Sequence, residues 1–219
     1  MNDLISIIIP CKNGENYLQE ALIGIQKQNM NVEIIVVDDG STDKTAEIAQ
    51  SYGCQVIRQP VSRGQVVAKN EGIKAAQGQY IMFHDHDDVM RENTLSTLYQ
   101  ALASDSELSV VMGKVKDFIS PDAQDKHTHL HAEPYWGLFT GAVLLKKDVF
   151  QKVGLFSEFL NSGEIIELTN KMKDANLKIQ KLDFVATDRR VHDTNYGKTN
   201  RTKEFKDYAS VLRARLHKA

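Results

Sequence analysis

The sequence has 219 residues, of which 42% are hydrophobic and 26% charged, a composition typical of one globular domain. The formal net charge of −2 argues against a nucleic-acid-binding protein. The two cysteines, Cys11 and Cys54, are too few for a disulfide framework, and no window reaches the roughly 20 apolar residues that span a bilayer. Because the N-terminus also lacks the basic residues of a secretory signal, a soluble, cytoplasmic protein without a transmembrane segment is predicted.

Strands and helices are predicted to alternate through about the first 85 residues. The run at 4–9 is apolar and ends at Pro10, as expected of a buried strand, whereas apolar residues between 17 and 25 recur at helical spacing. Such alternation predicts parallel strands joined by right-handed helical crossovers. The predicted strands are 4–9, 32–37, 55–57 and 80–83, and the predicted helices are 17–25, 41–49 and 64–76.

Polar residues follow three of these predicted strands. Pro10-Cys-Lys-Asn13 follows the first strand, Asp38-Asp39 the second and Asp85-His-Asp-Asp88 the fourth. Because ligands bind outside the carboxyl ends of parallel strands, we expect the three segments to converge on one edge of the sheet. That edge is the predicted ligand site.

The second half of the chain is less regular. Helices are expected at 94–103, 147–153 and 165–175, extended segments at 108–115 and 179–186, and a polar loop at 120–134. An amphipathic helix at 203–216 would dock on the domain, mediate a homodimer or lie on an anionic membrane. The sequence thus predicts one α/β domain at 1–200, with a mostly parallel central sheet flanked by helices, and a helical tail at 201–219.

Three carboxylates, Asp85, Asp87 and Asp88, follow the fourth predicted strand, with His84 and His86 interleaved. Close carboxylates repel one another unless a cation or protons compensate. Hard oxygen ligands suit Mg²⁺ or Mn²⁺, and either ion could bridge the oxygens of a diphosphate. The alternative is that this segment is a solvated acidic turn that caps the next helix. Asp38 and Asp39, which end the second predicted strand, could in the same way have only the structural role of capping a turn.

A series of short motifs runs through the chain in order. They are Ser6 to Pro10 with Asn13, Val32 to Asp43, Arg63-Gly64, Ala68 to Gly72, Ala76 to Ile81, Asp85 to Asp88, Thr140-Gly-Ala142, Phe150 to Phe156 and Gly163-Glu164. Together they resemble the family 2 glycosyltransferases of the GT-A fold over about residues 4–192. The resemblance implies a single GT-A domain with a Rossmann-like sheet, a donor half at about 1–115 and an acceptor half at about 116–200. It also implies metal-dependent transfer of a sugar from a nucleotide diphosphate, most simply a UDP-sugar, to a hydroxyl group.

The resemblance implies roles for individual residues. The donor-binding residues would be Pro10, Asn13, Glu15, Asp39, Arg63, Lys69 and Asp85, with Asp39 facing the base. Mn²⁺ or Mg²⁺ would be bound by Asp87, Asp88 and His192. Arg63 and Lys69 could instead be surface cations, and His192 a structural histidine.

An inverting transfer needs a general base for the acceptor hydroxyl. The family places an Asp directly after the Glu at position 164, whereas this chain has Ile165, which cannot accept a proton. The predicted base is Glu164, or Glu167 about one helical turn away, and the alternative is that both are structural surface carboxylates.

Two further residues belong to the predicted acceptor side. The resemblance places Gly141 there, and Trp136, the only tryptophan, would stack on an acceptor sugar or anchor its loop. His127, His129 and His131 alternate and could share one face of an extended segment as metal ligands, but no carboxylate pattern accompanies them.

Three classes of function fit these residues. The first is an active, inverting transferase whose acceptor is a saccharide, a lipid-linked sugar or a peptide. The second, motivated by Ile165, is a nucleotide-sugar-binding module that lacks a base and acts with a partner. The third is a sugar nucleotidyltransferase, ranked last because Gly14 is the single glycine in the loop after the first strand.

Overall fold

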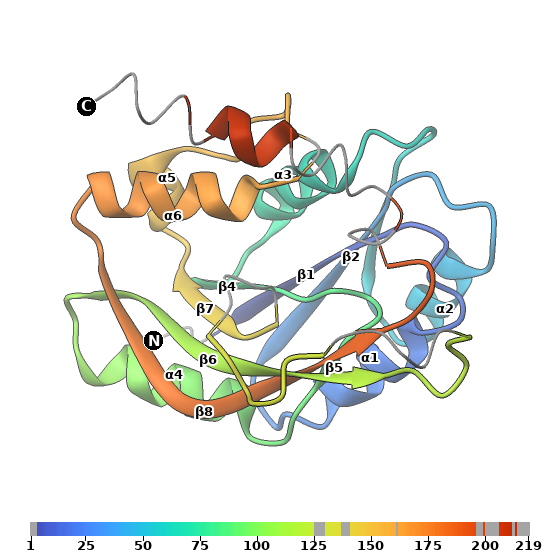
Figure 1. The fold of residues 1–219 in the computed structure, drawn as a ribbon, viewed down its shortest axis with the longest axis horizontal. Coiled ribbons are helices and arrows are strands. Elements are labelled where there is room, and N and C mark those ends of the chain that lie inside the picture. Colours follow the sequence, from blue (N-terminus) through green and yellow to red (C-terminus); the bar gives the residue numbers. More distant parts are fainter. Residues whose placement is uncertain are drawn as a thin grey trace.

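The computed structural model describes residues 4–124, 130–136, 141–160, 162–195, 199, 206–211 and 213. They form one curved, eight-stranded sheet with helices on both faces (Figure 1). The strand order is β3-β2-β1-β4-β7-β6-β8-β5. The strands are β1 (Ile5–Cys11), β2 (Val32–Asp38), β3 (Gln55–Arg58), β4 (Tyr80–Phe83), β5 (Val89–Met90), β6 (Leu108–Ile119), β7 (Val143–Lys146) and β8 (Lys178–Val191).

The first four strands in the order, β3-β2-β1-β4, are parallel to one another. Ile7 of β1 lies opposite Ile34 of β2 and Met82 of β4. Every residue of β1 is buried, which explains the continuous apolar run in its sequence. The predicted alternation of strands and helices is confirmed, and the carboxyl ends of β1, β2 and β4 lie at one edge of the sheet.

The helices form two layers, one on each face of the sheet (Figure 1). Because side chains alternate along a strand, Ile8 of β1 faces one layer while Ile7 and Ile9 face the other. A Cβ at Gly72 would lie 2.3 Å from Ile8 Cγ2, so this glycine allows α3 to pack closely on β1. One layer holds α1 (Leu18–Gln26), α2 (Thr45–Ser51) and α4 (Thr94–Ser104), and the other holds α3 (Gln65–Ala75), α5 (Val149–Val153) and α6 (Glu164–Asp174).

The second half of the sheet departs from the parallel pattern. β7 lies antiparallel between β4 and β6, and β8 runs parallel to β6. The short β5, which directly follows the acidic cluster, pairs antiparallel with β8, so that Val89 lies opposite Asp188. The end of β8 therefore lies beside the acidic cluster, although the sequence predicts neither β5 nor the continuation of β8 beyond Ala186.

Residues 206–211 of the tail are helical and dock at the start of α6. The Ser162 backbone N–H donates a hydrogen bond to the Asp207 carboxylate at 3.0 Å. Val211 is buried in the same core cluster as Leu168 and Met172 of α6. Of the three predicted roles for the tail, the structure shows docking on the domain, and a homodimer stays a prediction. Within the described ranges, no helix has the length and apolar character needed to cross a membrane.

Candidate functional site

Two loops at the carboxyl edge of the sheet are connected by hydrogen bonds. The Asn13 backbone N–H donates to Ser41 Oγ at 2.9 Å, and Asn13 Oδ1 accepts from the Thr42 N–H at 3.0 Å. The Glu15 carboxylate accepts from the Lys44 N–H at 3.3 Å. The predicted convergence of the segments after β1 and β2 is confirmed, and Asn13 and Glu15 help to shape this edge.

Asp39 connects the end of β2 to the start of α3. Its carboxylate accepts hydrogen bonds from Ser62 Oγ at 2.7 Å and from the backbone N–H groups of Arg63 at 2.6 Å and Gly64 at 3.0 Å. Asp38 caps its own turn, because it accepts a backbone N–H three residues further on at 2.8 Å. A donor base facing Asp39 would thus meet a carboxylate whose orientation these bonds fix.

The two predicted donor-binding cations lie in different surroundings. The Arg63 side chain is half exposed, and its Nη2 lies 3.8 Å from Glu158 Oε2. Lys69 is buried, with its Nζ 2.5 Å from Glu164 Oε1 and 5.9 Å from the centre of the Phe83 ring. The exposure of Arg63 therefore agrees with the alternative interpretation that it is a surface cation. The burial of Lys69 excludes that interpretation for Lys69.

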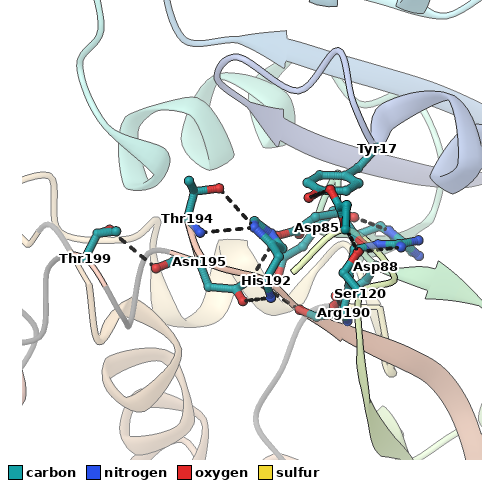
Figure 2. A network of polar contacts seen from close by, with 12 residues as sticks. Tyr17, Asp85, Asp88, Ser120, Arg190, His192, Thr194, Asn195 and Thr199 are labelled. Atoms are coloured by element: carbon teal, nitrogen blue, oxygen red, sulfur yellow. Dashed lines mark hydrogen bonds and ion pairs between the residues drawn. The ribbon is translucent and has the colours of Figure 1, made fainter. Parts of the chain in front are cut away.

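Asp87 and His192 form the centre of the site. His192 Nε2 lies 2.9 Å from Asp87 Oδ2, and the Asn195 amide donates to the same oxygen at 3.3 Å. The other ring nitrogen of His192 lies 2.9 Å from Thr194 Oγ1, and the ring centre lies 4.7 Å from that of Tyr17 (Figure 2). The end of β8 thus supplies an imidazole directly to the acidic cluster.

The neighbouring carboxyl groups Asp87 and Asp88 differ in their pKa values. Burial alone would raise the pKa of Asp87, but the hydrogen bond from His192 and the charges of His86 and His192 lower it to about 2. The pKa of Asp88 is raised well above its usual value, because Asp88 is fully buried and lies near the negative charges of Asp87 and Asp85. Asp87 is therefore the carboxylate that is ionised throughout the neutral pH range.

Arg190 binds both residues of this pair. Its Nε donates to the Asp87 carbonyl oxygen at 2.8 Å, and its backbone N–H donates to Asp88 Oδ1 at 2.9 Å. Its guanidinium also contacts Glu20 Oε2 at 2.5 Å and lies 5.0 Å from the centre of the Tyr17 ring. Asp88 therefore faces β8, and its role as a metal ligand stays a prediction.

Asp85 and Gly141 lie next to the buried His84. Burial lowers the pKa of His84, so the ring is neutral and its Nδ1 donates to the Asp85 carbonyl oxygen at 2.7 Å. The Asp85 carboxylate is partly exposed and accepts no hydrogen bond within the described part of the chain. Gly141 has a φ of +83°, and a Cβ there would lie 2.9 Å from Thr187 Oγ1 and 3.5 Å from the His84 ring. The glycine thus allows the acceptor-side segment to approach the end of β4.

Both predicted bases have partners in the structure. Glu164 is buried against Lys69, as described above. Glu167 accepts a hydrogen bond from the Ser157 N–H at 3.1 Å and lies 3.2 Å from Lys171 Nζ. A base role for Glu164 stays a prediction that requires its ion pair with Lys69 to open.

Trp136 lies at the edge formed by β6 and β8. Its indole N–H donates to the Leu182 carbonyl oxygen at 2.9 Å, and Lys114 Nζ lies 4.3 Å from the ring centre. The residue remains 45% exposed. Trp136 therefore anchors its loop, and enough of the indole is exposed for the second predicted role as an acceptor platform.

A buried carboxylate that the sequence analysis did not single out, Asp117, organises the polar loop after β6. It accepts hydrogen bonds from Tyr135 Oη at 2.8 Å and from His131 Nδ1 at 2.8 Å, and Arg189 Nη1 lies 3.4 Å away. Burial would raise the pKa of Asp117, but the hydrogen bonds from His131 and Tyr135 lower it. His131 thus has a carboxylate partner, whereas His127 and His129 lie outside the described residues.

The centre of the site fits a divalent cation that also takes ligands from a bound molecule. Asp87 Oδ2 and His192 Nε2 lie 2.9 Å apart, at hydrogen-bond distance, so a cation bound to both atoms would replace this hydrogen bond. Among the described residues, no three Asp, Glu, His or Cys side chains converge into a complete cage. Mg²⁺ commonly uses one or two protein ligands and completes its shell with phosphate oxygens and water.

Comparisons with known sequences agree with the motifs. The profile of "Glycosyl transferase family 2" matches residues 6–161. The glycosyltransferase GlyG of Streptococcus pneumoniae is 40% identical over 128 residues, which cover 56% of this chain and 42% of that protein. An uncharacterized glycosyltransferase of Rickettsia typhi is 32% identical over 98% of this chain and 73% of its own length. The chain thus spans less than half the length of the pneumococcal relative.

Solved structures show the same fold. S. aureus TarS 1–349 in complex with UDP-GlcNAc matches with a TM-score of 0.76 and 23% identity, covering 96% of this chain and 64% of that one. The mannosyltransferase PcManGT from Pyrobaculum calidifontis, in complex with GDP-Man and Mn²⁺, matches with a TM-score of 0.73 and 18% identity. This match covers 95% of this chain and 64% of the PcManGT chain. The GT-A fold expected from the motifs is confirmed.

Proposed function

Because the chain belongs to glycosyltransferase family 2, we propose that it transfers a sugar from a nucleotide diphosphate, most simply a UDP-sugar, to an acceptor hydroxyl. The observation that carries the proposal is the contact between Asp87 and His192 at the carboxyl edge of the parallel strands. TarS with UDP-GlcNAc and PcManGT with GDP-Man and Mn²⁺ support it, because both share the fold. The free thiols Cys11 and Cys54 are consistent with the predicted cytoplasmic location.

The proposed donor site extends from the acidic cluster towards the loops after β1 and β2. Asp85, whose carboxylate is partly exposed, would accept a ribose hydroxyl. Asp39 would face the base, and the half-exposed Arg63 would reach the phosphates. The backbone of Pro10, which lies opposite Val37 in the sheet, and the connected side chains of Asn13 and Glu15 would complete the nucleoside end.

A Mn²⁺ or Mg²⁺ ion would be held by Asp87 and His192 and would supply positive charge to the leaving diphosphate. Asp87 is suited to this role because its carboxylate is ionised in the neutral pH range. Two further residues position Asp87. Asn195 donates a hydrogen bond to its carboxylate, and Arg190 donates one to its carbonyl oxygen.

For transfer with inversion, Glu164 would take the proton of the acceptor hydroxyl while the hydroxyl oxygen attacks the anomeric carbon opposite the diphosphate. Glu164 must leave Lys69 for this step, because the two side chains are buried against each other. The same contact favours a second candidate function. With Glu164 and Glu167 engaged and Ile165 unable to accept a proton, the chain would bind the donor and leave transfer to a partner.

A thermal-shift screen of nucleotide sugars, with and without Mn²⁺, tests the proposal and identifies the donor. At least one nucleotide sugar should raise the melting temperature in a Mn²⁺-dependent manner, and Asp87→Asn should abolish this effect. Asp183→Asn, which changes an exposed carboxylate on β8, is the control and should behave like the wild type. Failure of all nucleotide sugars to stabilise the folded wild type would contradict the proposal.

Release of nucleoside diphosphate distinguishes the two candidate functions. If Glu164 is the base, Glu164→Gln should lower release by about 100-fold or more while the variant is still stabilised by the donor. Stabilisation of the wild type without release, for every acceptor class tried, would favour the binding module instead.

A further inference from the structure

A pocket of about 480 Å³ lies where β2 and β3 end, at the carboxyl edge of the parallel strands. We call it the β3 pocket. Its lining residues are Gly40, Ser41, Thr42, Arg58, Gln59 and Pro60. Two of them, Ser41 and Thr42, also hydrogen-bond to Asn13 of the loop after β1. The β3 pocket therefore adjoins the proposed nucleoside end of the donor site, and its volume is within the range of small-molecule sites.

Buried polar atoms without hydrogen-bond partners are concentrated beside the β3 pocket. In the described part of the chain, five buried side-chain atoms have no partner, and three of them belong to Asp38 and Gln59. Both polar amide atoms of Gln59 are among them, and the residue is only 6% exposed. An unpartnered buried amide destabilises a folded protein, so its presence indicates that a bound molecule uses it.

Gln59 lies next to Asp39, the residue proposed to face the donor base. The two directly follow the paired residues Asp38 and Arg58, and the Gln59 N–H donates to the Asp38 carbonyl oxygen at 2.9 Å. The Asp39 carboxylate already accepts three hydrogen bonds from residues 62–64, and a carboxylate can only accept. A primary amide both donates and accepts. Of the two side chains, only Gln59 can pair with a ring N–H and a carbonyl oxygen at once.

Arg58 adds donors to the β3 pocket. Its Nε lies 3.3 Å from Asp38 Oδ2, and its side chain is 59% exposed, so the outer N–H groups can reach a ligand. A guanidinium cannot accept a hydrogen bond, and it therefore favours a ligand edge with carbonyl oxygens over one with an amino group. Uracil and guanine present a carbonyl beside a ring N–H, whereas cytosine and adenine present an amino group beside an unprotonated ring nitrogen. The lining thus fits the first two bases.

We propose that Gln59 is the residue that reads the base of the donor nucleotide, by accepting a hydrogen bond from a ring N–H and donating one to the adjacent carbonyl. The amide turns towards the base by rotation about its side-chain bonds, which breaks no hydrogen bond because it makes none. Arg58 donates to a carbonyl oxygen of the same base. This inference rests on the proposed transferase function and assigns its base specificity to particular residues.

Gln59→Met tests the proposal, because it keeps an unbranched side chain of similar length and removes the amide. It should raise the melting temperature of the ligand-free protein by roughly 2–4 °C, since a buried amide without partners is lost. It should also weaken binding of UDP or GDP in the presence of Mn²⁺ by about tenfold in a calorimetric titration. Pyrophosphate with Mn²⁺, which has no base, should bind the variant and the wild type equally.

The control variant is Gln55→Met, which makes the same substitution at the exposed first residue of β3. It should change neither the melting temperature nor the affinity for any of these ligands. The wild type alone supplies a second measurement that does not depend on a variant. The tighter binder of UDP and GDP identifies the base, and it should bind at least about tenfold more tightly than CDP and ADP.

Three results would overturn the inference. The first is unchanged binding of UDP and GDP by Gln59→Met, the second is a lower melting temperature of this variant without ligand, and the third is binding of CDP or ADP as tight as that of UDP and GDP. If any of them occurs while a nucleotide sugar still stabilises the wild type with Mn²⁺, the inference fails and the proposed function stands. If no nucleoside diphosphate or nucleotide sugar binds the folded wild type, both fail.

Discussion

At the scale of single residues, Lys69 and Glu164 form a buried ion pair whose loss would be costly. Their charged atoms lie 2.5 Å apart, and the side chains are only 3% and 4% exposed. Two buried charges compensate each other, but either one alone would remain buried without a counter-charge. The pair therefore restrains α6 against α3 close to the end of β4.

Glu164→Gln is expected to destabilise the protein by about 3–5 kcal/mol, because it leaves Lys69 buried without an opposite charge. Urea unfolding at neutral pH measures the loss. The control is Glu71→Gln in the exposed pair with Lys74, where we expect a change within about 1 kcal/mol. A loss for Glu164→Gln no larger than that of the control would show that the buried pair does not exist in solution.

Asp117 gives the protein a pH dependence in the acidic range. Its pKa in the folded state is lower than the unfolded value of about 3.9. A lowered pKa means that Asp117 contributes stability that is complete above about pH 5 and is lost as the pH falls through 4 towards the folded-state value. Asp117→Asn should thus show a smaller drop in melting temperature between pH 5 and 3 than the wild type. If the melting temperatures of Asp117→Asn and the wild type fell equally between pH 5 and 3, Asp117 would not be the source of this pH dependence.

The residues of the site were predictable to different degrees. Asp87 and His192 could be named because each belongs to a recognisable motif. Arg190 and Asn195 could not, because their contacts with Asp87 join residues 103 and 108 positions apart. These contacts exist only through the pairing of β5 with β8, which leaves no periodic signal in the sequence.

At the scale of elements, the start of α6 depends on the docked tail. Gly163 has a φ of +80°, and a Cβ there would lie 2.9 Å from Cδ1 of Tyr208. Gly53, which ends the turn after α2, has a φ of +72°, but a Cβ there would meet nothing within 4 Å. Both glycines therefore have a positive φ, and of the two only Gly163 contacts the tail.

Comparison of Gly163→Ala with Gly53→Ala measures this docking. Both should lose about 1 kcal/mol from the strained φ, and Gly163→Ala should lose more because Tyr208 must move. Urea unfolding of both variants gives the difference. Equal losses would show that the tail does not pack on Gly163 in solution.

The elements of the first half were easier to predict than those of the second. β1 is buried on both faces and reads as a continuous apolar run, so that its position follows from composition alone. β5 has only two residues, Val89 and Met90, which is too short to show alternation. The end of β8 carries Asp188, Arg189 and Arg190, whose charges conceal a strand that is stabilised by its partners β5 and β6.

At the scale of the whole molecule, the alternation of strands and helices was sufficient to predict where ligands bind. The carboxyl ends of β1, β2 and β4 lie at the same edge, and the polar segments that follow these strands meet there. The antiparallel β7 and the long β8 complete the sheet in the half that is predicted to bind the acceptor. That half depends on contacts between distant segments, so its arrangement could not be inferred from local patterns.

The most direct test of the central claim is a calorimetric titration of the stabilising nucleotide sugar into the wild type, with and without Mn²⁺. We predict that Mn²⁺ tightens binding at least about tenfold, and that Asp87→Asn and His192→Ala each remove this gain while Asp183→Asn keeps it. Binding that is equally tight with and without Mn²⁺, or a Mn²⁺ effect that survives in Asp87→Asn and His192→Ala, would contradict the assignment of the donor diphosphate and its cation to Asp87 and His192.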